Sequence, residues 1–185
     1  MSTSPPASQP SSHPFFPDGP GLLRRTPRVL DAMLRGLPDA WGRATEGPGT
    51  WSPFDVVGHL IHGERADWML RVEHILAHGP ARPFPPFDRE AMLEASRGRS
   101  LDALLDQFAE LRNAGLHRLA KLQLTDADLT RGGLHPDLGS VTLGQHLSTW
   151  VAHDLGHLVQ VSRTMGRTLR DAVGPWRRYL RYLDP

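Results

Sequence analysis

The sequence predicts an all-α protein that folds as a four-helix bundle. Four segments repeat apolar residues at helical spacing, and stretches rich in glycine and proline separate them. No run of alternating apolar and polar residues is long enough to predict a strand, and nothing repeats at the period of a solenoid. The 185 residues fit one domain, which buries about two thirds of its unfolded surface and needs no disulfide.

A tail precedes this domain. Residues 1–21 are rich in proline and serine, carry almost no charge and contain few aliphatic residues, so we predict a disordered tail at 1–21 and a helical domain at 22–185. The tail lacks the basic start and the apolar run of a secretory signal, and no stretch of about 18 apolar residues occurs in the chain. We therefore expect a cytoplasmic protein without a membrane segment.

The first helix is expected to follow Thr26 and Pro27, which suit an N-cap and a first-turn proline. Pro38 interrupts the helical pattern, so the end of this helix stays open. The apolar face carries Leu30, Met33, Leu34, Leu37 and Trp41.

The second helix has the clearest start signal in the chain. Ser52 occupies the N-cap position, a proline follows it, and Asp55 takes the third helical position. Trp51 and Val56 occupy the two ends of a hydrophobic staple. The helical pattern continues to about His78.

A proline-rich connection at 79–99 joins the second helix to the third. We expect it to lie over the bundle, with a short helical turn at 89–95. Ser100 then caps a third helix, which extends to about Gln123 and looks mainly structural. Its apolar stripe consists of Leu101, Leu104, Leu105, Phe108, Leu111, Leu119 and Leu122.

A Thr-x-x-Gln capping box, formed by Thr142 and Gln145, begins the fourth helix after a glycine-containing loop. This helix is expected to end near Met165. A short amphipathic C-terminal helix is expected after Gly174, with apolar positions at Trp176, Tyr179, Leu180 and Leu183.

The composition narrows the chemistry that the chain can perform. It contains ten histidines, no cysteine, and 21 basic against 20 acidic residues. Without cysteine it has no disulfide, no cysteine-based zinc cluster and no thiol nucleophile of its own. The balanced charge does not predict a nucleic-acid partner. The histidines are notable because imidazole is the commonest metal ligand.

Two histidines of the fourth helix form a chelating pair. His153 and His157 lie four residues apart, so both imidazoles project from one face, beside the apolar face centred on Leu147. A further ligand is needed, and the second helix offers His59 and His62. Three neutral imidazoles with one open position are typical of a catalytic zinc site. The alternative is that these histidines are ordinary structural residues.

A stripe of small residues, Ser148, Ala152 and Gly156, lies on the far side of the fourth helix. Small side chains let two helices approach closely. We expect this stripe to contact another helix of the bundle or a second copy across a dimer.

Three segments together resemble the DinB/YfiT-like superfamily. They are residues 51–60 (WSPFDVVGHL), 135–145 (HPDLGSVTLGQ) and 150–160 (WVAHDLGHLVQ). The likeness spans about residues 22–170 and preserves the order of the four helices. It implies an up-down-down-up bundle, a homodimer and one bound divalent metal ion.

The resemblance also implies which residues hold the ion. Carried onto this chain residue by residue, the ligands are His59, His153 and His157. The pattern does not require His62 or His146. Zinc or nickel is the expected metal, because both suit imidazole ligands.

An ion of this kind lowers the pKa of a bound water or thiol toward neutrality. Some relatives in the superfamily resemble transferases and isomerases that use bacillithiol, mycothiol or glutathione, and an external thiol is compatible with a chain that has no cysteine. We therefore expect a metal-dependent enzyme, a thiol S-transferase or a hydrolase, that acts on a small molecule. The alternative is a noncatalytic metal-binding protein with a stress or interaction role.

A hydrolase also needs a group that transfers protons. Asp154, Asp67 and Glu64 are near the histidines in sequence, and the pattern singles out none of them as the base. The 79–99 connection is a candidate for lining a pocket. Arg163 is left outside the site, since an arginine late in a helix more often interacts with the helix dipole.

Other metal-site architectures match less well. The fourth helix resembles the His-Glu-x-x-His helix of metalloproteases, with Asp154 in place of glutamate, but no sheet and no nearby third ligand accompany it. An HD-type phosphohydrolase would pair Asp154 with His153, yet the interval back to His59 is long for that pattern. A di-iron bundle requires Glu-x-x-His motifs, and the sequence has none.

Overall fold

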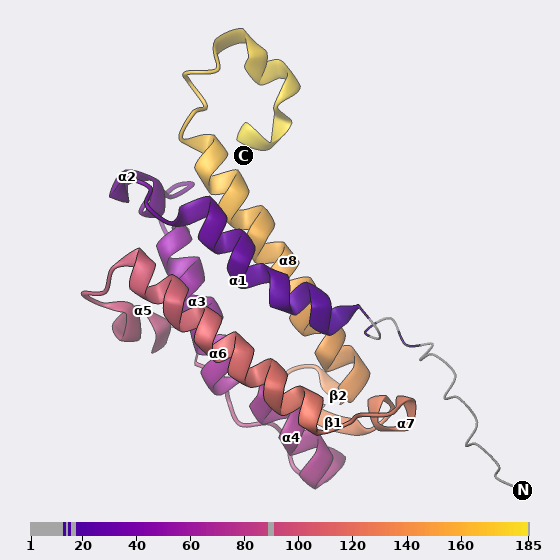
Figure 1. Ribbon diagram of the computed structural model, residues 1–185. Helices are drawn as coiled ribbons and strands as arrows, with labels where there is room; N and C mark the ends of the chain where they lie inside the picture. The colour runs from indigo at the N-terminus through magenta and orange to yellow at the C-terminus, as the bar shows by residue number, and fades with distance from the viewer. Residues whose placement is uncertain (1–12, 14, 16–17, 89–90, 185) are drawn as a thin grey trace, which may run out of the picture.

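The computed structural model describes residues 13, 15, 18–88 and 91–184, and within them the chain forms the predicted four-helix bundle. Figure 1 shows α1 and α8 running in one direction, with α3–α4 and α6 running in the opposite direction. This is the up-down-down-up order. The bundle helices are α1 (Gly19–Leu34), α3 (Pro53–Ala66) continued by α4 (Trp68–His78), α6 (Leu101–Lys121) and α8 (Leu143–Arg167).

Helix α1 begins earlier than the sequence predicts. It starts at Gly19, so Thr26 is not its N-cap and Pro27 lies inside the helix. An internal proline cannot donate to the carbonyl four residues earlier, which here belongs to Leu23. Arg112 of α6 donates its Nη1–H to that carbonyl at 2.8 Å. A contact between two helices therefore compensates for the proline.

Most of the predicted tail (1–12, 14, 16 and 17) lies outside the described residues. Next to that part, Phe15 is buried against the bundle, with 2% of its surface exposed. At the other end of α1, Trp41 does not continue the helix as predicted. It belongs to the separate short helix α2 (Asp39–Gly42), because Leu34 ends α1 four residues before Pro38.

The second predicted helix starts as expected and is divided into two parts. Ser52 and Asp55 form a complete capping box at the start of α3. Asp67 leaves the helical conformation, with φ −128° and ψ −78°, and separates α3 from α4. The side chain of Asp67 then forms an ion pair with Arg71 in the next turn, at 2.6 Å.

The proline-rich connection packs against the rest of the fold. It contains the 3₁₀ turn η1 (Gly79–Ala81) and the short helix α5 (Ala91–Ser96), close to the turn that the sequence predicts. Between them, the N–H of Phe84 donates to the carbonyl of Leu134 at 2.9 Å. The Phe84 ring is buried, so the connection forms a wall of the bundle.

A small hairpin lies before α8 where the sequence predicts only a loop. After α7 (Asp126–Leu129), strands β1 (Gly132–His135) and β2 (Gly139–Thr142) pair antiparallel. Each strand has four residues, too few for a recognisable alternating pattern. Thr142 ends β2 and forms the predicted capping box with Gln145, so the hairpin leads directly into α8.

The predicted C-terminal helix is present, but it is a 3₁₀ helix in two parts, η2 (Gly174–Tyr179) and η3 (Arg181–Leu183), and not an amphipathic α-helix. Only Leu183 among its apolar residues is buried, while Trp176 and Tyr179 are exposed. An amphipathic helix needs a surface on which to bury its face, and this segment extends from the end of α8 (Figure 1).

The small-residue stripe on α8 does not contact another described helix. Ser148 is half-buried, whereas Ala152 and Gly156 are exposed, and outside its own stretch of helix nothing in the described chain lies within 4 Å of where a Cβ on Gly156 would stand. Leu155 and Val159 are exposed beside them. The expectation of a contact inside the bundle is therefore wrong, and a contact across a dimer stays a prediction.

The apolar core fills the bundle in two clusters. One surrounds the stacked rings of Trp68 and Trp150, and the other surrounds Leu60 and Phe108. None of the helices in the described part of the chain combines the length and apolar character that a membrane span requires.

Candidate metal centre

Three histidines from two helices meet between the two core clusters. His59 lies in the second turn of α3, whose start is fixed by the Ser52 cap. His153 and His157 lie one turn apart on α8, whose start is fixed by the Thr142 cap. The three residues that the sequence proposes as ligands are therefore brought together by two defined helix starts.

Their spacing fits one ion. The Nε2 atom of His153 lies 3.0 Å from Nε2 of His59 and 3.1 Å from Nε2 of His157. Two nitrogens that each lie about 2.0–2.1 Å from a metal are about 2.9–3.4 Å apart at bond angles of about 90–110°. One donor atom from each side chain lies within 4.8 Å of the others. The three side chains present a donor set suited to a divalent metal ion.

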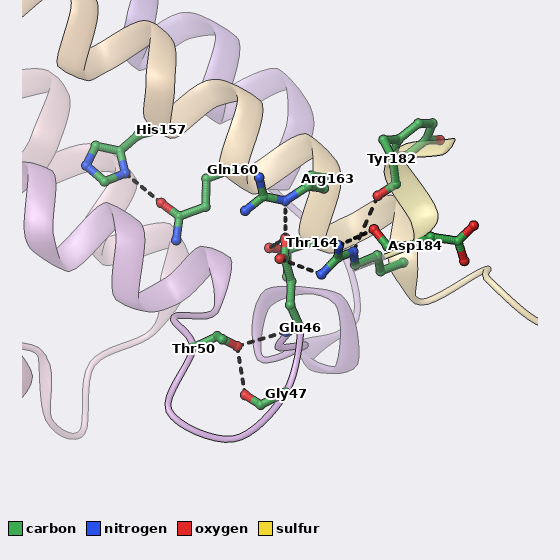
Figure 2. A network of polar contacts seen from close by, with 10 residues as sticks. Glu46, Gly47, Thr50, His157, Gln160, Arg163, Thr164, Tyr182 and Asp184 are labelled. Atoms are coloured by element: carbon green, nitrogen blue, oxygen red, sulfur yellow. Dashed lines mark hydrogen bonds and ion pairs between the residues drawn. The ribbon is translucent and has the colours of Figure 1, made fainter. Parts of the chain in front are cut away.

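Gln160 fixes the orientation of one of these rings. The Nδ1–H of His157 donates to the side-chain carbonyl of Gln160 at 2.9 Å, as Figure 2 shows. With its proton on Nδ1, His157 keeps the lone pair of Nε2 for an ion. A hydrogen bond of this kind selects the tautomer and raises the basicity of a ligand.

Aromatic rings enclose the centre. Trp51 stacks against His157 with centroids 6.3 Å apart and contacts His59 at 4.7 Å. Trp68 meets the edge of His153 at 5.0 Å. These rings limit the rotation of the imidazoles.

Burial keeps His153 and His157 uncharged. Together with the smaller effect of the neighbouring rings of His157 and His59, it lowers the pKa of His153 to about 3. Burial also lowers the pKa of His157, although its hydrogen bond with Gln160 opposes the change. At neutral pH His153 and His157 therefore each keep one ring nitrogen free of a proton, which is the state that a metal requires.

A loop before α3 is clamped to the same part of α8. One oxygen of Glu46 accepts hydrogen bonds from Arg163 at 2.7 Å and from Thr164 at 3.0 Å (Figure 2). Its other oxygen accepts one from Arg167 at 2.7 Å. Burial raises the pKa of Glu46, but these bonds and charges outweigh it and lower the pKa overall. This loop ends at Trp51, so the clamp supports the ring that covers His157.

Two of the three acidic residues near the histidines do not face the centre, whereas Asp67 lines the cleft beside it and pairs with Arg71. Asp154 and Glu64 both bind Arg112, whose side chain is fully buried between them. The two oxygens of Asp154 lie 2.5 and 3.0 Å from the guanidinium, and Glu64 Oε1 lies 2.9 Å from its Nε. This arrangement removes both carboxylates as catalytic bases. It also removes the HD-type pairing of Asp154 with His153.

A cleft of about 730 Å³ opens beside the three histidines. Its walls come from α3, α4, α8, the 84–87 segment and the β1–β2 hairpin, and they are mainly aromatic and apolar. The 79–99 connection lines this cleft as the sequence suggests, through Phe84, Pro86 and Phe87. Arg163 lies outside it, as expected, in the Glu46 clamp.

The remaining histidines have other surroundings. His62 packs against Phe87 with centroids 4.7 Å apart and is not part of the three-histidine group. The Nε2–H of His146 donates to the carbonyl of Trp68 at 3.0 Å. Burial lowers the pKa of His146 to about 4. Neither residue takes part in the centre, in agreement with the resemblance.

Sequence patterns do not identify the buried partner of the two carboxylates. Arg112 stands in the third helix, which reads as structural, and nothing in its neighbourhood distinguishes it from the exposed arginines nearby. The one signal is Pro27, since an internal proline leaves a carbonyl that needs a donor.

Comparisons with known proteins agree with this architecture. A family model described as the DinB superfamily matches residues 22–161, well over half of the chain. The solved structure of YfiT from Bacillus subtilis, described as "a probable metal-dependent hydrolase with an unusual four-helix bundle topology", is similar with a TM-score of 0.73 and 23% identity. The alignment covers 89% of this chain and 93% of YfiT. At this identity the likeness shows the fold. A search of the curated proteins gives no match.

Proposed function

The chain belongs to the DinB superfamily, and from this premise we propose that it is a metal-dependent enzyme acting on a small molecule held in the cleft. The observation that carries the proposal is the convergence of three Nε2 atoms from His59, His153 and His157. The description of YfiT as a metal-dependent hydrolase supports it. Zinc or nickel is the proposed ion.

When bound, a divalent ion on three neutral imidazoles supplies a Lewis acid that lowers the pKa of water or of a low-molecular-weight thiol. His59, His153 and His157 would hold it, and Gln160 keeps one ligand in the correct tautomer. The protein contributes no thiol, because it has no cysteine. The proposed reaction is therefore hydrolysis, or transfer of an external thiol.

Proton transfer requires a group other than the buried carboxylates. His135 lines the cleft at the end of β1, and its Nδ1 accepts the backbone N–H groups of Asp137 and Leu138 at 3.1 and 3.3 Å. The neutral ring therefore carries its proton on Nε2. His135 packs against Phe84, with ring centroids 6.0 Å apart, so it lies toward the Phe84 end of the cleft and is not assigned a role at the three histidines.

Metal binding is the first test of this proposal. Protein loaded with Zn²⁺ or Ni²⁺ and then desalted should retain about one ion per chain by elemental analysis. His153→Ala should lose it, whereas His62→Ala, which alters a histidine outside the group, should retain it. Equal metal content in the two variants would show that the site is assigned wrongly.

Turnover is the second test. Metal-free and reloaded protein should be compared on two panels: low-molecular-weight thiols with monochlorobimane, and chromogenic esters and amides. Metal-dependent turnover in the first panel identifies a thiol transferase and in the second a hydrolase. Stoichiometric metal without turnover in either panel would favour the noncatalytic metal-binding alternative.

A further inference from the structure

One charged side chain in the metal cleft has donors that the fold does not use. Arg71 of α4 lines the cleft, and only 13% of its side chain is exposed. Its Nε lies 2.6 Å from Oδ1 of Asp67, and its guanidinium lies over the ring of Phe84 at 5.1 Å. Its two Nη groups make no hydrogen bond to any of the described residues.

The unused donors open onto the cleft, so an acceptor on a bound molecule can reach them. Asp67 occupies the Nε edge, and Phe84 fixes the plane of the group. Four N–H bonds are left over on the two Nη groups, and the two that point in parallel, one from each group, match the two oxygens of a carboxylate. The Nη side of the Arg71 guanidinium is therefore suited to binding a planar anion.

The charges around Arg71 favour a monoanion. Arg71 is the only lysine or arginine among the described residues of the cleft, and Asp67 already offsets part of its charge. The other acidic residue there, Asp137, is exposed, and His146 is uncharged at neutral pH. Arg71 is one cation, and Asp67 already offsets part of its charge, so a phosphate dianion would be poorly neutralised here. A carboxylate carries one negative charge and can be bound by one arginine.

The position of Arg71 sets the length of the ligand. His146 lies near this end of the cleft, since its ring is 6.4 Å from Phe84. It precedes His153 by seven residues of α8, or about 10 Å along the helix axis. A molecule that reaches from the histidines to Arg71 is therefore about the size of a dipeptide. Between the two ends it meets Trp68, which contacts both His146 and His153.

We propose that Arg71 binds a carboxylate of the substrate, and that the substrate is a small aromatic or apolar molecule with a carboxylate about 10 Å from its reacting group. This inference rests on the proposed function for the role of the histidine end. The Arg71 end can be measured by binding alone.

Hippurate and its uncharged amide, hippuramide, are matched probes, because they differ only at the carboxylate. Trp51 and Trp68 line the cleft, so binding can be followed by tryptophan fluorescence in metal-free and zinc-loaded protein. We expect hippurate to bind about 10- to 100-fold more tightly than hippuramide. Arg71→Gln should abolish that difference, and Arg118→Gln, which removes an arginine paired with α4 outside the cleft, should preserve it.

The Asp67→Asn variant distinguishes binding of a carboxylate by Arg71 from a purely structural role of the Arg71–Asp67 ion pair. If the Arg71–Asp67 pair only supports the fold, both single variants should weaken binding of the two probes alike. If Arg71 binds the carboxylate, Asp67→Asn should retain or strengthen hippurate binding, because it removes a competing anion. Equal affinity for the two probes, no saturable binding of hippurate, or discrimination that survives in Arg71→Gln would overturn the proposal. If the protein does not bind zinc but still binds hippurate more tightly than hippuramide, the result would count against the proposed function and not against the role of Arg71.

Discussion

Asp154 of α8 binds Arg112 of α6 through both carboxylate oxygens, at 2.5 and 3.0 Å, and points away from the metal centre. Its neighbour in sequence, His153, places Nε2 3.0 Å from Nε2 of His59. Adjacent residues on α8 therefore have separate tasks. Asp154 anchors the helix in the bundle, and His153 faces the cleft.

Replacing Arg112 with methionine should destabilise the protein by about 3–5 kcal/mol, because two buried carboxylates and the Leu23 carbonyl lose their partner. Urea unfolding measures the change. Arg35→Gln is the control, since Arg35 also pairs with several carboxylates but on the surface, and it should have little effect.

The cause of that loss can be tested separately. Adding Glu64→Gln and Asp154→Asn to the Arg112→Met variant removes the uncompensated charges and should recover part of the stability. If Arg112→Met costs no more than Arg35→Gln, the buried ion pairs do not anchor the helices.

Gln160→Leu should lower the affinity for zinc about 10- to 100-fold, because His157 loses the acceptor that fixes its tautomer. Gln160→Glu keeps an acceptor and should restore most of the affinity. Competition with a chelating dye measures both constants. Ser162→Ala alters an exposed position of α8 and should bind zinc like the wild type. An unchanged affinity in Gln160→Leu would show that this hydrogen bond does not tune the site.

The helices that carry the site are predictable because their start signals are local. Ser52 and Thr142 form capping boxes with residues three positions later, so each helix start can be read from four residues. Since the periodicity of a helix then fixes the side on which each residue lies, the positions of His153 and His157 beside the core follow as well. The likeness to a known family supplies His59 as their partner.

The features that the sequence misses depend on distant partners. Pro27 is tolerated inside α1 because Arg112, from another helix, donates to the carbonyl that the proline leaves free. Phe84 is held by Leu134 of the hairpin, 50 residues later. No local pattern records such pairs, and Arg71 becomes a candidate ligand-binding residue only when the cleft around it is known.

Lowering the pH should destabilise the metal-free protein through His146. Burial lowers its pKa from 6.5 to about 4 in the fold, so the unfolded chain binds this proton more readily. Unfolding is therefore favoured as the pH falls from about 6.5 to about 4, by an amount on the order of 2 kcal/mol between pH 7 and pH 5. Urea unfolding at the two pH values, with a chelator present, measures it.

His146→Gln is the matched variant, because an amide can still donate to the Trp68 carbonyl but does not titrate. The loss of stability between pH 7 and pH 5 should be smaller in this variant than in the wild type, with His153 contributing the same change to both. An identical pH dependence in the two proteins would show that His146 binds its proton as readily in the folded chain as in the unfolded chain.

Glu46→Gln should destabilise the protein by about 1–2 kcal/mol at neutral pH, because Glu46 accepts charged hydrogen bonds from Arg163 and Arg167 (Figure 2). The pKa of Glu46 is lowered below 4.5 in the fold, so its contribution is present above that pH and is lost as the pH falls through the lowered value. The difference between wild type and variant should therefore hold from pH 7 to pH 4.5 and shrink as the pH falls further. Glu94→Gln, which removes an exposed ion pair with Arg97, should show no such dependence.

Since the clamped loop ends at Trp51, Glu46→Gln should also change tryptophan fluorescence and weaken zinc binding. A variant that behaves like Glu94→Gln in all three measurements would mean that the clamp does not support the metal centre.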